Sequence, residues 1–140
     1  MSEIDKQLIE KRLDTILKYC QEVDTLLEFS NNEIKDDTLK THSLERLVQL
    51  VVDEIIDVNE YIIQVYNLPV PDDFQSTFLM LSKHNVFDEE FARQIAPVVG
   101  LRNRIVHRYE EINLELLIDT VRKEKEDFKK FVSFVLKFIK

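Results

Sequence analysis

The chain has 140 residues, with one cysteine, one glycine, three prolines and a formal net charge of −8 at pH 7. This length suits one domain with its own hydrophobic core, so we predict a single domain over residues 1–140. The scarcity of glycine and proline argues against a sheet protein, and the abundance of Leu, Ile, Val, Phe, Glu and Lys favours long helices. The negative charge argues against a general nucleic-acid coat protein, because phosphate affinity comes largely from charge neutralisation. It still permits a small basic cleft.

The sequence also predicts where the protein works. No apolar run is long enough to span a bilayer, and the N-terminal residues alternate charged and apolar types, unlike a signal peptide. A single cysteine, Cys20, excludes an internal disulfide and fits a reducing cytosol. We therefore expect a cytoplasmic protein that does not contact membranes.

Two long helices are predicted in the first half of the chain. The first covers about 2–29, with one apolar seam at Ile9, Leu13, Ile16, Cys20, Val23 and Leu27, and it breaks at 30–32. The second begins near Asp37 or Thr38 and extends to Tyr66. Its seam repeats the same spacing at Leu44, Val48, Val51, Ile55, Val58, Ile62 and Val65. The prolines at 69 and 71 end it, because proline cannot continue a helix.

The middle of the chain predicts two shorter helices. One covers about 73–84, with Phe74, Phe78 and Leu81 facing inward and Asn85 as its stop. The next begins after an N-cap at Asp88. It contains Pro97 and Gly100, where we expect a kink or a local break.

The last predicted helix runs from about Asn113 to the end, with an apolar seam that only Glu124 interrupts. Its charged residues predict a solvated face: Arg122, Lys123, Glu124, Lys125, Glu126, Asp127, Lys129 and Lys130. Short connections between long amphipathic helices predict an all-α, antiparallel four- to five-helix bundle. The heptad-like seams of the first two helices leave room for a dimer face.

Residues 102–109 stand out from this plain helical pattern, with the sequence Arg-Asn-Arg-Ile-Val-His-Arg-Tyr. On a helix, Asn103 and His107 are four residues apart and share one face. Arg102 and Tyr109 are seven apart and point in nearly the same direction, on the neighbouring face. All four side chains can therefore line one cleft. Arg104 and Arg108 are also four apart, on another sector, where they can add positive field or contact a phosphate backbone.

These groups suit the cleavage of RNA by its own 2′-hydroxyl. His107 can transfer a proton near neutral pH, and Arg102 can stabilise charge on a phosphoryl oxygen. Asn103 can orient the imidazole or the phosphate. The motif includes no metal-ligand cluster, so we expect neither a metal nor another cofactor. The reaction needs one general base and one general acid, but each chain supplies only one motif histidine. A symmetric dimer would supply a second histidine.

Simpler roles exist for each residue alone. Arg102 could form a surface ion pair, His107 could be a partly buried structural histidine, and Tyr109 could be a core or interface aromatic. Asp57 could face solvent, or it could pair with Arg102 or Arg104 across the bundle, since acids inside bundles usually need a partner.

The spacing Arg-x4-His-x-Tyr near the start of the last third of an all-helical chain resembles the HEPN ribonuclease motif. More closely, the chain resembles the HepT-type toxins of the HEPN–MNT toxin–antitoxin systems. The resemblance extends over 57–62 (Asp-Val-Asn-Glu-Tyr-Ile), the Pro-Val-Pro loop at 69–71 and the approach to the motif at 100–104. It covers almost the whole chain, from about 13 to 138.

The resemblance implies a metal-independent endoribonuclease, the toxin of a type VII-like system, whose dimer forms a composite cleft from two motifs. It implies catalytic roles for Arg102 and His107, a supporting role for Asn103 and an RNA substrate, with tRNA as a candidate. It further implies that a minimal nucleotidyltransferase antitoxin neutralises the toxin by transferring AMP from ATP to Tyr109. The alternative is a non-catalytic helical dimer that binds a nucleotidyltransferase partner or a nucleotide, which the net charge favours slightly.

Overall fold

The computed structural model describes residues 4–107 and 113–140, and all regular structure in these two ranges is helical. In chain order the elements are α1 (Lys6–Leu26), α2 (Asn31–Asp36), α3 (Thr38–Val65), α4 (Gln75–Lys83), α5 (Glu89–Ile95), α6 (Val98–His107) and α7 (Leu114–Ile139). The prediction of an all-α fold is confirmed.

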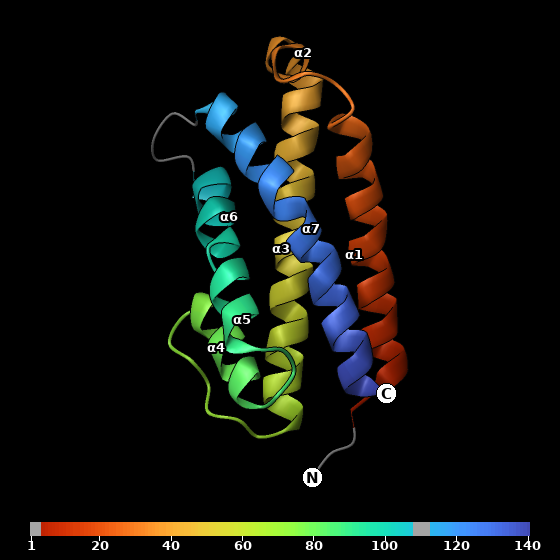
Figure 1. Cartoon of the computed structure of the whole chain (residues 1–140), viewed down its shortest axis with the longest axis vertical. Helices are drawn as coiled ribbons and strands as arrows, with labels where there is room; N and C mark the ends of the chain where they lie inside the picture. Colours follow the sequence, from red (N-terminus) through yellow and green to blue (C-terminus); the bar gives the residue numbers. More distant parts are fainter. Residues whose placement is uncertain (1–3, 108–112) are drawn as a thin grey trace.

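The long elements form an antiparallel up-down-up-down bundle (Figure 1). From the end where both termini lie, α1 runs away, α3 returns, α5 and α6 together run away again, and α7 returns. The short α2 closes the far end, and α4 packs on α3 and α5 near the termini. The bundle thus has four columns, and its third column is a broken helix made of α5 and α6.

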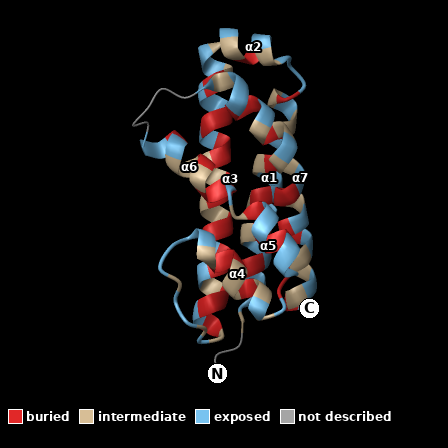
Figure 2. Cartoon of the chain, turned by 60° about the vertical axis from the view of Figure 1, so that its left-hand side comes forward, coloured by how far each residue is buried: buried red, intermediate tan, exposed pale blue. Residues whose placement is uncertain are grey.

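The core lies on the predicted seams. Every seam residue of the first two predicted helices is buried, including the entire α3 series from Leu44 to Val65. Figure 2 shows these buried stripes along the inner faces of the long helices. Cys20 is 3% exposed, and burial raises the pKa of its thiol to about 11, so it acts as a small core residue. Burial of these apolar faces holds the columns together.

The helix ends differ in places from the prediction. α1 is shorter at both ends than 2–29, and the predicted break after it contains the separate helix α2. Ser30 and Glu33 form a reciprocal capping box at the start of α2, which provides partners for two backbone N–H groups. Ser30 therefore starts a helix where the polar run suggested only a break.

Two asparagines end helices in the left-handed conformation. Asn67 follows α3 with φ 51°, and Asn85 follows α4 with φ 65°. After Asn85, the backbone N–H of Val86 donates to the carbonyl of Leu81, the 6→1 bond of a Schellman motif. The predicted stop at Asn85 is confirmed, and so is the N-cap at Asp88, whose side chain accepts from Phe91 N.

The predicted break falls at Pro97, between α5 and α6. Proline has no N–H to donate to the carbonyl four residues earlier, so the helical ladder is interrupted there. Gly100, by contrast, lies inside α6, and the helix continues through it. The break in the third column therefore lies at Pro97, just before the residues of the motif.

Three side chains lie in places that the sequence did not predict. Phe74 was expected to face inward but is 43% exposed, whereas Phe78 and Leu81 are buried as predicted. His84 packs against the rings of Tyr66 and Phe138, with centroids 4.7 and 5.9 Å away. Asp127, expected on the solvated face of α7, is only 4% exposed and accepts a 2.7 Å hydrogen bond from Gln94 Nε2 on α5.

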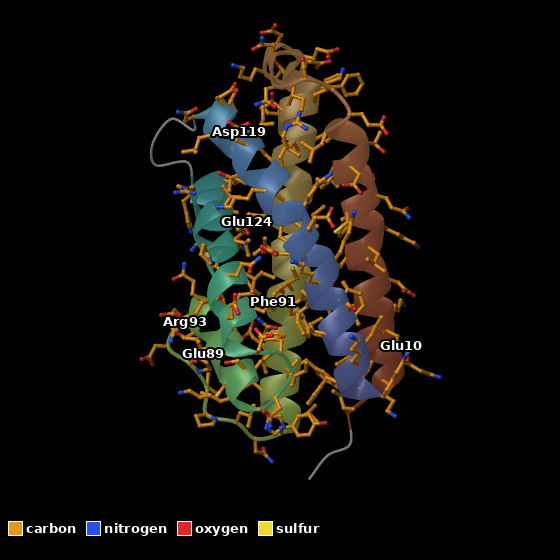
Figure 3. The ribbon with its side chains drawn as sticks, viewed as in Figure 1. Glu10, Glu89, Phe91, Arg93, Asp119 and Glu124 are labelled. Atoms are coloured by element: carbon orange, nitrogen blue, oxygen red, sulfur yellow. The ribbon has the colours of Figure 1, made fainter. Side chains whose placement is uncertain are left out.

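Glu124 lies one turn before Asp127, on the side of α7 that faces the α5–α6 column (Figure 3). Its Oε2 is buried and has no hydrogen-bond partner among the described residues. Burial, followed by the influence of the nearby Asp127 carboxyl, raises the pKa of Glu124 to about 7. Glu124 is therefore largely protonated at mildly acidic pH, although carboxyls of this type usually ionise near pH 4.5.

This pKa gives a testable pH dependence of stability. The folded state keeps a proton on Glu124 that the unfolded chain releases near pH 4.5, so the stability contribution is complete below that pH and is lost as pH rises to about 7. We expect urea unfolding of the wild type to show this decline. Glu124→Gln, which cannot ionise, should lack it. Parallel curves for the two proteins between pH 4.5 and 8 would contradict the assignment.

Candidate functional site

The site is built on α6, which two buried residues, Leu101 and Ile105, anchor to the bundle. They are four apart and therefore share the face that packs on α3. Arg102 and Asn103 follow Leu101 and are half-buried at the edge of this contact. Because Leu101 and Ile105 fix the rotation of α6 against α3, helical geometry determines the directions in which the motif side chains point.

Arg102 is held by two acceptors. Its Nε donates to Asp53 Oδ1 on α3 at 2.7 Å, and its Nη1 donates to Asn103 Oδ1 at 3.1 Å. The side chain of Arg102 is 21% exposed and that of Asp53 35%, so the ion pair lies at the mouth of the bundle. Among the described residues these contacts use Nε and part of Nη1, so Nη2 can meet an anion.

The remaining motif residues on α6 are exposed. His107 is the last residue of the helix, one turn beyond Asn103, and Arg104 faces solvent. The predicted grouping of Arg102 with Asn103 is therefore observed directly. His107 occupies the expected helical position relative to Asn103. Arg108 and Tyr109 lie outside the described residues, so their predicted places in the cleft stay predictions.

The acidic partner of the motif arginine is Asp53, which the sequence analysis did not single out. Asp57 instead lies near Arg12 of α1, which contacts both Glu54 and Asp57 at 3.1 and 3.4 Å. The suggested pairing of Asp57 with Arg102 or Arg104 is therefore wrong, whereas the alternative that Asp57 faces solvent is confirmed by its 53% exposed side chain. A sequence signal existed, because Asp53 is one helical turn before Asp57 on the same face of α3.

The described residues hold neither a metal-binding cluster nor a membrane-spanning helix. Among residues 4–107 and 113–140, no group of three or more His, Cys, Asp or Glu side chains could hold a metal ion. Within the same ranges, no helix has both the length and the apolar composition needed to cross a bilayer. The chemistry of the described site is that of one guanidinium, one amide, one carboxylate and one imidazole.

A four-column helical bundle that carries Arg-x4-His on its third column is the arrangement expected from the resemblance to HEPN domains. The comparisons agree with this class. A family model described as ribonuclease HepT-like matches residues 16–135. The chain is 36% identical over 117 residues to a tRNA nuclease HepT of Aphanizomenon flos-aquae, covering 81% of this chain and 77% of that protein. It is 27% identical over 104 residues to an mRNA nuclease HepT of Shewanella oneidensis, covering 74% and 78% respectively.

The fold likeness extends over the whole molecule. The tri-AMPylated HEPN toxin of Shewanella oneidensis, solved in complex with its MNT antitoxin, superposes with a TM-score of 0.86. That match has 23% sequence identity and covers 96% of this chain and 99% of the other. The chain belongs to the HepT-like ribonuclease family. The predicted family, fold class and enzyme class are confirmed.

The contact with Asp53 predicts a positioning role that can be measured. We expect Asp53→Asn to lower kcat for RNA cleavage by about 10- to 100-fold, because a displaced guanidinium meets the phosphate poorly. KM should change little, since the positive charge of Arg102, which attracts the RNA phosphates, is retained. Asp53→Glu should recover part of the loss. Asp57→Asn, one turn away and in contact with Arg12, is the matched control, and an equal effect of both changes would exclude a specific role.

Proposed function

We propose that this chain is the toxin of a two-gene toxin–antitoxin system and acts in the cytoplasm as a metal-independent endoribonuclease. The observation that carries the proposal is the arrangement of Arg102. Asp53 and Asn103 fix its guanidinium, and His107 extends from the same helix one turn past Asn103. A fixed, partly desolvated cation on the same helix as an exposed imidazole suits phosphodiester chemistry.

In the proposed reaction the 2′-oxygen of the RNA attacks the adjacent phosphorus and the bond to the 5′-oxygen breaks. A base accepts the 2′-hydroxyl proton, and an acid returns a proton to the leaving 5′-oxygen. The products are a 2′,3′-cyclic phosphate and a 5′-hydroxyl. Arg102 stabilises the charge on the non-bridging phosphoryl oxygens, His107 transfers protons, and Arg104 and Arg108 contact the RNA backbone.

The need for both a base and an acid supports a homodimer. Each chain supplies one motif histidine, so a two-fold axis beside α6 would bring two imidazoles to one phosphate. His107 is exposed at the end of α6, where a second chain could approach it. The substrate class we propose is RNA, with tRNA the first candidate because a relative is named a tRNA nuclease.

We further propose that a minimal nucleotidyltransferase silences the enzyme. The phenol oxygen of Tyr109 would attack the α-phosphorus of ATP, pyrophosphate would leave, and the phenolic proton would pass to a base. Each attached AMP brings negative charge and bulk to the region of Arg102 and would compete with RNA there. A structural neighbour is an AMPylated toxin bound to its antitoxin, which supports this mode of control.

The test uses the full chain, shown by mass spectrometry to carry no AMP. We expect it to cleave total RNA in excess EDTA and to leave 2′,3′-cyclic ends. Protein adenylylated on Tyr109 should be inactive, whereas Tyr109→Phe should stay active when the nucleotidyltransferase and ATP are added. If unmodified protein fails to cleave any RNA, the non-catalytic binding module becomes the better explanation.

A further inference from the structure

A groove lies beside the connection between α3 and α4, and none of its lining residues belongs to α6. It has a volume of about 510 Å³ and is formed by the last two turns of α3, the Pro-Val-Pro loop and the start of α4. Figures 1 and 2 show this connection standing out from the bundle near the end where the termini lie, with most of its residues exposed. The proposed nuclease chemistry uses none of these residues.

Two of the apolar side chains that line the groove are exposed: Val70 is 85% exposed and Phe74 is 43% exposed. The apolar lining also includes Leu68 and the buried Ile63. Phe74 was expected in the core from its helical spacing, yet it faces the groove. Because a partly apolar cavity of this volume falls in the range of ordinary binding sites, an occupant would bury this surface favourably.

The charge of the groove indicates what kind of occupant fits. Glu60, Asp72 and Asp73 line it, and the described lining residues include no lysine or arginine. Hydrogen bonds from Ser76 hold the pKa of Asp73 below its ordinary value, so this carboxylate stays ionised at neutral pH. These three carboxylates at one groove attract cationic groups.

We propose that this groove docks a cationic-apolar segment of a partner protein, in which a bulky apolar side chain flanked by Lys or Arg enters the groove. The apolar side chain packs on Val70 and Phe74, and the flanking cations meet Glu60, Asp72 and Asp73. The site is independent of RNA cleavage, so its failure would leave the nuclease proposal intact.

The probe is the acetylated and amidated hexapeptide Lys-Lys-Leu-Phe-Lys-Lys. Titrated into isotope-labelled protein, it should shift the NMR amide signals of 60–77. Two comparison peptides separate the contributions: Lys-Lys-Ser-Ser-Lys-Lys lacks the apolar anchor, and Glu-Glu-Leu-Phe-Glu-Glu reverses the charge. Both should bind more weakly than the first.

The matched variants test the site rather than the net charge. Asp72→Asn/Asp73→Asn, which keeps a capping side chain at 73, should weaken the first peptide about three- to tenfold, and Val70→Ser should also weaken it. Asp36→Asn/Glu90→Gln removes the same charge from exposed positions on α2 and α5 and should have no effect. RNA cleavage should be unchanged in all three variants.

Three outcomes would overturn the proposal. Equal weakening by both double variants, or equal binding of the serine peptide, would mean general attraction to an acidic protein. Shifts outside 60–77 would place the peptide elsewhere. Concentration-dependent self-association that Val70→Ser abolishes would mean that a second copy of this chain covers the groove.

Discussion

Replacing His107 with alanine should lower the rate of RNA cleavage by about 10²- to 10⁴-fold, the usual contribution of a positioned proton-transfer group. The protein should fold normally, because His107 is exposed at the end of α6 and fills no core position. The measurement is single-turnover cleavage of a labelled RNA in excess EDTA, with circular dichroism as the check on folding. His42→Ala, at an exposed position on α3, is the control and should retain full activity.

A mixing experiment sharpens this prediction. If the two histidines of a dimer act on one phosphate, only dimers with two intact chains cleave at the full rate. After exchange with excess His107→Ala chains, activity should fall as the square of the wild-type fraction. A linear fall would mean that each chain carries a complete site, and the composite cleft would then be wrong.

Replacing Arg102 with alanine should lower kcat by about 10²- to 10³-fold, similar to the loss of one fixed donor to a developing oxyanion. Arg102→Lys should recover only part of the activity. A lysine ammonium is a point charge and lacks the planar fork that donates to Asp53 and Asn103 from separate nitrogens. Arg93→Ala is the matched control, since Arg93 is an exposed arginine of α5 that pairs only with Glu89 in the described contacts (Figure 3).

The double variant Asp53→Asn/Arg102→Ala tests whether the two residues act as one unit. If Asp53 works by positioning Arg102, removing it in the Arg102→Ala background should cost little more, so the two effects should not add. Fully additive losses in kcat would mean that Asp53 acts on the substrate or on His107 by its own route. Arg102→Ala combined with Asp57→Asn provides the additive reference.

Much of the fold could be predicted because the apolar periodicity is nearly unbroken. The seam of α3 from Leu44 to Val65 is buried as its spacing predicts, and Pro97 separates α5 from α6 because proline removes a hydrogen bond wherever it lies. The short helix α2 was missed, since six residues carry too little periodicity to distinguish a capped helix from a polar break. Phe74 was misplaced because its spacing fits α4, but that helix begins only at Gln75.

By itself, the sequence determined the helical bundle, the position of the motif on one helix and the grouping of Arg102 with Asn103, because these depend on spacing along a single helix. Only the tertiary structure decided which acid meets Arg102. The angle between α3 and α6 brings Asp53 to the guanidinium and leaves Asp57 with Arg12, although both acids share one face of α3. The same holds for the burial of Glu124, the largest cause of its raised pKa, which the spacing of α7 does not reveal. Contacts between helices depend on their crossing angles and side-chain packing, which cannot be read from the spacing of residues along one helix.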